Sequence, residues 1–195
     1  MSRTLLIVVG IALLFGFYGC STYNGLVGKD VTVQDAWAKV QTQYQRRSDL
    51  IPNLVNTVQG AANFEKGTLT AVIEARAKAT SVNLTADQLT PENMQKFQAA
   101  QEQLSGSLSR LLVSVEQYPQ LKANQNFLEL QAQLEGTENR ITVARNDFNT
   151  TVKDYNTSVR TFPANIFAGV FGFAAKGFFE ASQAAQSAPT VSFPK

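Results

Sequence analysis

The side chains that most often carry chemistry in proteins are scarce in this sequence of 195 residues. It has one cysteine and no histidine, which excludes His-based triads, histidine-ligated haem, zinc sites built from Cys and His, and iron–sulfur clusters. No glycine-rich loop of the G-x-G-x-x-G or Walker type is present. Carboxylate chemistry stays open, but no close pair of carboxylates stands out. We therefore expect no enzymatic activity, no metal and no cofactor.

The one cysteine, Cys20, is a candidate for lipid modification. It follows the small residue Gly19 and an uncharged apolar run of 15 residues, and Arg3 supplies a positive charge before that run. This order is typical of a secretory signal, and an acylated cysteine would hold the protein to a bilayer by its lipid chains. Phe17 and Tyr18 are bulky for residues beside a cleavage site. Lipidation of Cys20 is therefore the alternative interpretation of this segment.

The same segment is long enough to cross a membrane. No charge occurs from Thr4 to Val27, and a helix of that length exceeds the hydrocarbon core of about 30 Å at 1.5 Å per residue. Tyr18 and Tyr23 would then lie near a membrane–water interface, where amphipathic rings are favoured. We predict a single-pass membrane anchor over residues 1–27. Positive charges flank it on both sides, so the sequence does not fix which side the soluble body faces.

A charged cluster, Arg46-Arg47-Ser48-Asp49, lies in the first part of that body. Arg47 occupies a position in an apolar stripe, where an unpaired charge is costly to bury. Our hypothesis is that Arg47 pairs with Glu138 of a later helix and fixes the register of the two helices, with Arg46 and Asp49 as alternates. Two other interpretations stay open. The cluster could be a polar face opposite the stripe, or it could bind an anionic partner.

The spacing of apolar residues over 33–58 predicts a helix that packs against others. Asp30 or Thr32 could cap its start. Pro52 should bend this helix near residues 48–52 without ending it, and Asn53 could hydrogen-bond the backbone that the bend frees. The apolar stripe consists of Val33, Trp37, Val40, Tyr44, Ile51, Leu54 and Val58. We expect Trp37 to be a core residue.

Further helices follow with clear boundaries. Gly60 and Gly67 loosen the continuation of the first helix, which carries small apolar residues to about residue 80, and residues 81–91 form a loop. Thr90 and Pro91 are good residues to start the next helix, which Pro119 interrupts. Beyond it, apolar residues recur every seven positions, which predicts one helix of about 35 to 40 residues. That last stripe consists of Phe127, Leu134, Ile141, Phe148 and Tyr155.

These patterns define the fold class. No segment shows sustained alternation of period two, so we predict an all-α chain: an anchor helix followed by an elongated antiparallel bundle of three to four long helices over residues 28–161. Residues 162–195 form a Phe-rich segment and a flexible tail. We expect its rings to cap the end of the bundle. The alternative is that they dock on a membrane surface or a partner.

The order and spacing of several short motifs make the chain resemble the LemA family. The resemblance covers nearly all of the chain after the anchor, and it departs at Gly19-Cys20, where many members continue an apolar helix. The motifs are Tyr23-Asn24-Gly25-Leu26-Val27, Ala36-Trp37, Arg46-Arg47-Ser48-Asp49-Leu50-Ile51-Pro52-Asn53-Leu54-Val55, Glu74-Ala75-Arg76-Ala77, Glu116-Gln117-Tyr118-Pro119, Leu134-Glu135-Gly136-Thr137-Glu138, Ala144-Arg145, Tyr155-Asn156, Phe162-Pro163-Ala164-Asn165 and Phe178-Phe179-Glu180-Ala181.

The resemblance implies a bacterial protein with one N-terminal membrane anchor and an elongated antiparallel helical bundle. It also implies no established catalytic activity, and scaffold or envelope roles that are sometimes linked to membrane zinc metalloproteases and stress responses. It adds Arg145 to the structural or interaction candidates.

We therefore expect a non-enzymatic, membrane-tethered scaffold or adaptor at the bacterial envelope that works through protein–protein association, including association with itself. A formal net charge of +2 with interspersed signs gives no basic field for nucleic acid. Two alternatives stay open: a carrier that holds a ligand in a bundle cavity, and a protein that binds lipid or the membrane surface.

Overall fold

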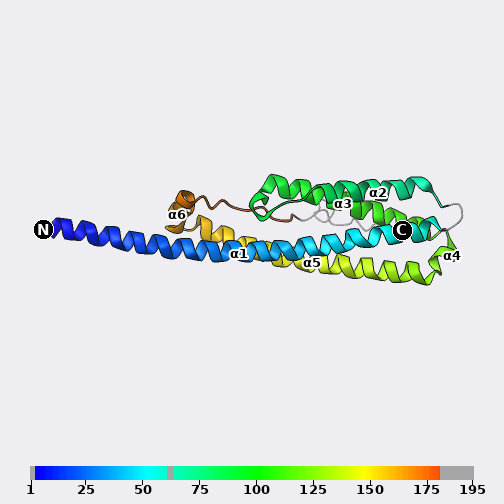
Figure 1. Cartoon of the computed structure of the whole chain (residues 1–195), viewed down its shortest axis with the longest axis horizontal. Coiled ribbons are helices and arrows are strands. Elements are labelled where there is room, and N and C mark those ends of the chain that lie inside the picture. The colour runs from blue at the N-terminus through cyan, green and yellow to red at the C-terminus, as the bar shows by residue number, and fades with distance from the viewer. Residues whose placement is uncertain (1–2, 61–63, 181–195) are drawn as a thin grey trace, which may run out of the picture.

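The computed structural model describes residues 3–60 and 64–180, and every regular element in these ranges is helical. This confirms the all-α prediction. The molecule is a long rod, in which the N-terminal part of α1 projects beyond the packed helices (Figure 1). The elements are α1 (Arg3–Gln59), α2 (Lys66–Ser81), the 3-10 turn η1 (Ala86–Gln88), α3 (Pro91–Val115), α4 (Pro119–Lys122), α5 (Gln125–Arg160) and α6 (Ala164–Phe171).

Helix α1 joins the apolar segment to the body without a break. Its 57 residues correspond to a length of about 85 Å. The expected helix start at Asp30 or Thr32 is therefore wrong, because the backbone before these residues already supplies the carbonyl groups that a helix needs. The Thr32 hydroxyl donates to the Gly28 carbonyl at 2.9 Å. Asp30 instead pairs with Lys176 at 2.8 Å.

Pro52 lies inside α1, and the helix continues past it as predicted. A proline at this position cannot donate a hydrogen bond to the carbonyl four residues earlier, which belongs to Ser48. Arg76 of α2 takes over that acceptor: its Nε donates to the Ser48 carbonyl at 2.9 Å. Asn53 does not have the role that we expected, since Arg76 and not Asn53 binds the freed carbonyl. The carbonyl freed by the proline thus ties α1 to α2.

The first helix ends earlier than the sequence suggested. Helix α1 stops at Gln59, and α2 is a separate helix from Lys66, so the loosened continuation is in fact a chain reversal. Phe64 in the connection is buried, and its ring lies 5.0 Å from that of Tyr118. That aromatic contact closes the end of the bundle that is remote from the projecting part of α1.

The predicted boundaries of the later helices hold. The Thr90 hydroxyl accepts a hydrogen bond from the Asn93 amide at 3.3 Å, and Pro91 is the first residue of α3. After the interruption by Pro119, the Asn124 side chain caps α5. Helix α5 has 36 residues, which confirms the predicted length. It pairs with α1 along its length, whereas α2 and α3 pack on each other as a hairpin (Figure 1).

The C-terminal segment does more than cap the bundle. Helix α6 packs beside α1 and ends at Phe171, and Gly172 after it has a left-handed φ of +79°. The chain then returns along the body in an extended stretch, here called the strap (residues 172–180). Phe167 caps the end of the bundle as expected, but Phe179 is buried in the core beside Trp37, a core residue as predicted. The predicted flexible tail lies outside the described residues.

Candidate functional site

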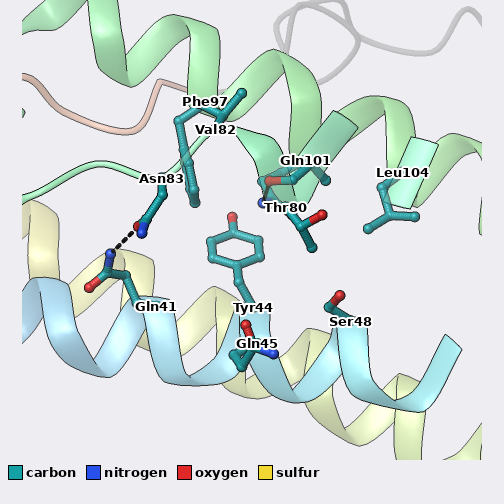
Figure 2. A pocket seen from close by; sticks show the side chains of 11 residues that line it. Gln41, Tyr44, Gln45, Ser48, Thr80, Val82, Asn83, Phe97, Gln101 and Leu104 are labelled. Carbon is teal, nitrogen blue, oxygen red and sulfur yellow. Dashed lines mark hydrogen bonds between the residues drawn. The ribbon is translucent and has the colours of Figure 1, made fainter. Parts of the chain in front are cut away.

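A small polar cleft lies between α1 and the hairpin of α2 and α3. Figure 2 shows the Tyr44 ring rising from α1 into it, with Gln101 of α3 on the far side. The volume of about 150 Å³ is below the roughly 300 Å³ at which ligand pockets begin. Burial raises the pKa of Tyr44 above its ordinary value, although the charges of Arg145 and Arg47 oppose this. This cleft is therefore smaller than a typical ligand pocket.

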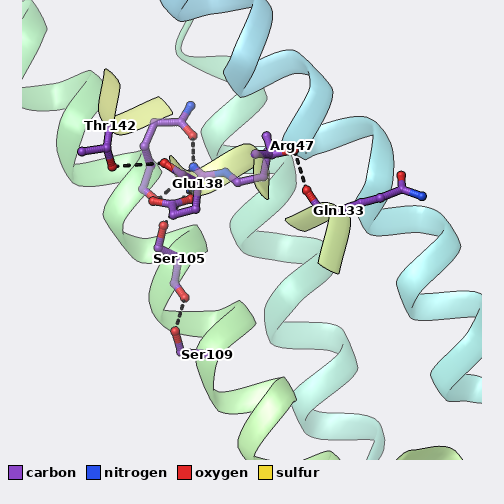
Figure 3. Close-up of polar contacts among 8 residues, drawn as sticks. Arg47, Ser105, Ser109, Gln133, Glu138 and Thr142 are labelled. Carbon is purple, nitrogen blue, oxygen red and sulfur yellow. Dashed lines mark hydrogen bonds and ion pairs between the residues drawn. The ribbon is translucent and has the colours of Figure 1, made fainter. Parts of the chain in front are cut away.

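Arg47 lies next to this cleft and is only 2% exposed. Its Nη1 donates to Glu138 Oε2 at 2.9 Å and to Ser105 Oγ at 2.8 Å, while Nη2 donates to Gln101 Oε1 at 2.6 Å (Figure 3). The guanidinium also lies 5.0 Å from the centre of the Tyr44 ring. The Arg47–Glu138 pair that the sequence predicted is thus present and joins α1 to α5, while the hydrogen bonds of Arg47 to Ser105 and Gln101 add α3.

Arg47 and the side chains that it binds, Gln101, Ser105 and Glu138, form a polar layer, here called the Arg47 layer. It separates two apolar clusters of the core. Tyr44, Phe97 and Ile141 belong to the cluster on the side of the projecting part of α1, and the next apolar seam residues on the same helices belong to the other cluster. Within the described part of the chain, Arg47 Nε and the Ser48 hydroxyl have no hydrogen-bond partner. A layer of this kind penalises any helix alignment that leaves its charge among apolar side chains.

The other residues of the charged cluster do not enter the layer. Arg46, Asp49 and Asn53 are exposed on α1 and line an open surface groove that Gln133 of α5 also borders. Asp49 accepts a hydrogen bond from Gln45 of its own helix at 2.7 Å. Arg46 and Asp49 are therefore not alternates for the buried pair, and they belong to the polar surface.

The strap is held by three amide side chains that the sequence analysis missed. Each one donates to the carbonyl of a strap residue and accepts from the amide of the same residue. Asn156 holds Lys176 in this way, with both hydrogen bonds at 2.8 Å. Asn149 holds Phe179 at 2.8 and 2.9 Å, and Gln98 of α3 holds Glu180 at 2.9 and 3.0 Å. These contacts link the strap to α5 and α3.

Two charged side chains complete the attachment of the strap. Lys176 pairs with Asp30 of α1 and donates to the Ala86 carbonyl at 3.0 Å. Arg145, which the resemblance had singled out, places its guanidinium 4.6 Å from the centre of the Phe179 ring and donates to the Glu180 carbonyl at 3.3 Å. The candidate residue Arg145, on α5, therefore binds the strap and is not part of the Arg47 layer.

Gly177 marks the closest approach of the strap to α3, and we expect Gly177→Ala to destabilise the protein by about 1–3 kcal/mol. A Cβ there would lie 2.8 Å from Pro91 Cα. The strap cannot simply withdraw, since the Gly177 amide donates to the Leu89 carbonyl at 2.8 Å. Urea denaturation measures the loss. Gly106→Ala in α3 is the control, because a Cβ there meets nothing within 4 Å. Equal effects of the two variants would contradict this placement of the strap.

A pH dependence arises at Tyr155, whose hydroxyl donates to the Ala174 carbonyl of the strap at 3.1 Å. Burial raises the pKa of Tyr155 from 10.0 to about 12, and the Asp30 carboxylate adds to this. The unfolded chain ionises this phenol near its ordinary pKa, so its contribution to stability is complete below pH 10 and is lost as the pH rises towards about 12. Denaturation midpoints across that range should fall less steeply in Tyr155→Phe. An identical slope in both proteins would contradict the assignment.

The contact of α6 with α1 explains a small residue near the cysteine. Phe167 lies over Gly19, where an added Cβ would come within 2.7 Å of its Cε1 atom. The Phe167 ring also lies 4.9 Å from Phe15 and 5.6 Å from Tyr18. Cys20 is exposed. The small size of Gly19 thus has a packing reason that is independent of any lipidation signal.

The first turns of α1 stand apart from the rest of the described chain because their apolar side chains are exposed. This is the only described helix that is long and apolar enough to cross a membrane. In the same part of the chain, residues 3–60 and 64–180, no three Cys, Asp or Glu side chains gather as metal ligands would. The exposed apolar residues of this section are Leu5, Leu6, Ile7, Val8, Val9, Ile11, Leu13, Leu14, Phe15 and Phe17.

Comparisons with known proteins place the chain among related bacterial sequences. It is 24% identical over 170 residues to Protein LemA of Metamycoplasma hominis, a match that covers 87% of this chain and 74% of the relative. It is 23% identical over 175 residues to Magnetosome protein MamQ 2 of Paramagnetospirillum magneticum, covering 81% of this chain. A MamQ protein of Magnetospirillum gryphiswaldense is also 23% identical, over 174 residues. The chain spans 64% of the length of these MamQ relatives, which is less than two thirds.

The model of the LemA family matches residues 36–193. That range begins within α1 and includes the Arg47 layer, the hairpin, α5 and the strap, so the match covers most of the packed body. The chain belongs to the LemA family.

Proposed function

We propose that this protein is a membrane-tethered helical scaffold at the bacterial envelope, and that it acts by binding other proteins rather than by catalysis. One observation carries the proposal: α1 is a single helix that begins with exposed apolar side chains and ends inside the packed body. Exposed apolar surface of this extent is typical of a membrane or protein contact. The names of the relatives, LemA and MamQ, are not enzyme names, which agrees with this proposal.

The contacts of α6 favour a spanning helix over a lipid anchor at Cys20. Cleavage before Cys20 would remove Phe15, Tyr18 and Gly19, and these residues form the surface on which Phe167 packs. A spanning helix keeps this packing surface intact. We therefore infer a single-pass anchor, with lipidation of Cys20 as the alternative outcome of the test.

The anchor is tested by extraction of membranes from bacteria that make the full chain. The wild-type protein should stay in the membrane after alkaline carbonate treatment, and so should Cys20→Ser. A variant with Leu6→Lys and Leu13→Lys should be released, because charges at the centre of a span are costly. Loss of membrane attachment in Cys20→Ser, together with a faster-migrating mature wild-type form, would instead establish a lipoprotein.

The groove beside the charged cluster is the surface that we assign to partners. Arg46, Asp49 and Asn53 are exposed on the rigid α1 helix, so they can meet a protein without any change in the fold. Candidate partners are a membrane protease, stress-response components and a second copy of the chain.

A photo-crosslinking amino acid at position 46 or 49 in living cells tests this surface. Val143, which is exposed on α5, provides the control position. Adducts that form at 46 and 49 but not at 143, and that purify as one defined species, would support a scaffold. The size of that species separates self-association from a different partner. Equal labelling at all three positions, or turnover of a substrate by the purified protein, would reject the proposal.

A further inference from the structure

We propose that α6 is a second membrane-contacting element, which lies in the interfacial region of the bilayer beside α1 with its exposed apolar face against lipid. The inference rests on the proposed membrane anchor and deepens it, because it assigns a lipid-facing surface to residues more than 140 positions away in the sequence. Three observations carry it: the position of α6 along α1, the chemistry of its outward face, and the charges that flank it.

The position of α6 follows from its aromatic contacts with α1. Phe167 packs on Phe15 and Tyr18, and the Phe171 ring lies 5.0 Å from Tyr23. At 1.5 Å per residue, Phe15 and Tyr23 are about 18 and 30 Å along the helix from Arg3. Because a hydrocarbon core is about 30 Å thick, α6 lies alongside the last part of the crossing. That is the depth at which a short helix meets both lipid chains and headgroups.

The outward face of α6 is apolar apart from Asn165, which is also exposed. Ile166 and Val170 are four residues apart on one face, and Val170 is 75% exposed. Phe162 and Phe171 are exposed beside them. This surface is continuous with the exposed apolar section of α1, since the two helices are in contact there (Figure 1). In water this apolar surface would stay exposed to solvent, whereas the membrane interface would bury it. The backbone hydrogen bonds of α6 are made within the helix, so burial there leaves them paired.

The charges agree with this placement. No charged residue occurs between Arg160 and Lys176, and none between Arg3 and Lys29. Lys29 and Arg160 are both exposed. Lys29 directly follows the uncharged stretch of α1, and Arg160 directly precedes the uncharged stretch that contains α6. Basic side chains at this level are attracted to anionic headgroups. The uncharged stretches of α1 and α6 thus end together, which is the pattern of two segments that share one interface.

The test measures the depth of single spin labels on the full chain in vesicles of phosphatidylcholine and phosphatidylglycerol. In a Cys20→Ser background, a nitroxide is attached at Val170→Cys, Leu13→Cys or Val113→Cys. All three side chains are exposed, so the labels remove no core packing. Accessibility to oxygen and to a water-soluble nickel complex reports depth. We expect at least a three-fold lower nickel accessibility at 170 than at 113, and deeper burial still at 13.

The possible outcomes separate the two proposals. A label at 170 that is as open to nickel as the label at 113, while the label at 13 stays protected, would overturn the interfacial role of α6 and leave the anchor standing. Full nickel accessibility at all three positions would instead reject the anchor itself. Protection at 170 that persists in detergent-free solution without vesicles would indicate self-association, and it would also count against lipid contact.

Discussion

Phe179→Ala is expected to lower the free energy of unfolding by about 3–5 kcal/mol, as is typical for the loss of a buried phenylalanine. The Phe179 ring is 5% exposed and lies 5.5 Å from Phe148 and 6.1 Å from Trp37. It also contacts the guanidinium of Arg145. Truncation leaves a cavity at the centre of the bundle. It also removes the apolar contact that keeps the strap close to the amide side chains that bind it.

Urea denaturation measures the stability, and hydrogen exchange of the amides of residues 176, 177, 179 and 180 measures attachment of the strap. These amides donate to protein acceptors in the folded chain, so they should exchange faster in the variant. Phe178→Ala is the matched control, because this neighbour is 41% exposed and its truncation should cost less than about 1 kcal/mol. Equal losses for the two variants would show that the strap does not bury Phe179.

The second large effect is expected at Arg47, where replacement by alanine should cost about 3–4 kcal/mol. The variant removes a fully buried side chain and leaves the buried amide of Gln101 without its donor. Glu138 behaves differently. Its carboxylate is 51% exposed and can be solvated, so Glu138→Gln should cost less than about 1 kcal/mol.

Denaturation of the two variants under the same conditions gives both values. The asymmetry is the informative result, because a simple ion-pair contribution would make both substitutions equally costly. If Glu138→Gln proved as damaging as Arg47→Ala, the hydrogen bonds of Arg47 to Gln101 and Ser105 would not be what holds the layer together.

Periodicity accounts for what could be predicted from the sequence. Apolar side chains at intervals of three, four and seven predicted the helices, and the interruption of one stripe by Arg47 predicted a buried charge with Glu138 as its partner. Thr90 and Pro91 predicted a helix start, because capping depends on residues that are adjacent in the sequence. In each case the pattern is local, or it repeats along one helix.

The strap could not be predicted in the same way, since its contacts join residues that are far apart. Gln98 holds Glu180 across 82 positions, and an amide on a polar helix face gives no sign of such a partner. One signal was available: Asn149 and Asn156 are seven residues apart, directly after the seam residues Phe148 and Tyr155. They therefore lie on the same face of α5, at the edge of its apolar stripe. A chain segment that packs along this edge can form backbone hydrogen bonds with both side chains. Arg76 was missed because no local pattern indicates that α2 folds back beside Pro52, where the Ser48 carbonyl lacks its helical donor.

The continuity of α1 has a geometric consequence for any protein that contacts its exposed apolar turns. Since no break separates the exposed apolar turns of α1 from the packed ones, the number of residues between them sets the angle between the apolar stripes and the faces of the body. One residue inserted before Phe15 would rotate those stripes by about 100° while leaving α6 and the body as they are. A protein that contacts the apolar turns of α1 would then meet a face about 100° away from its present one, so the residue count of α1 sets the direction in which the body points.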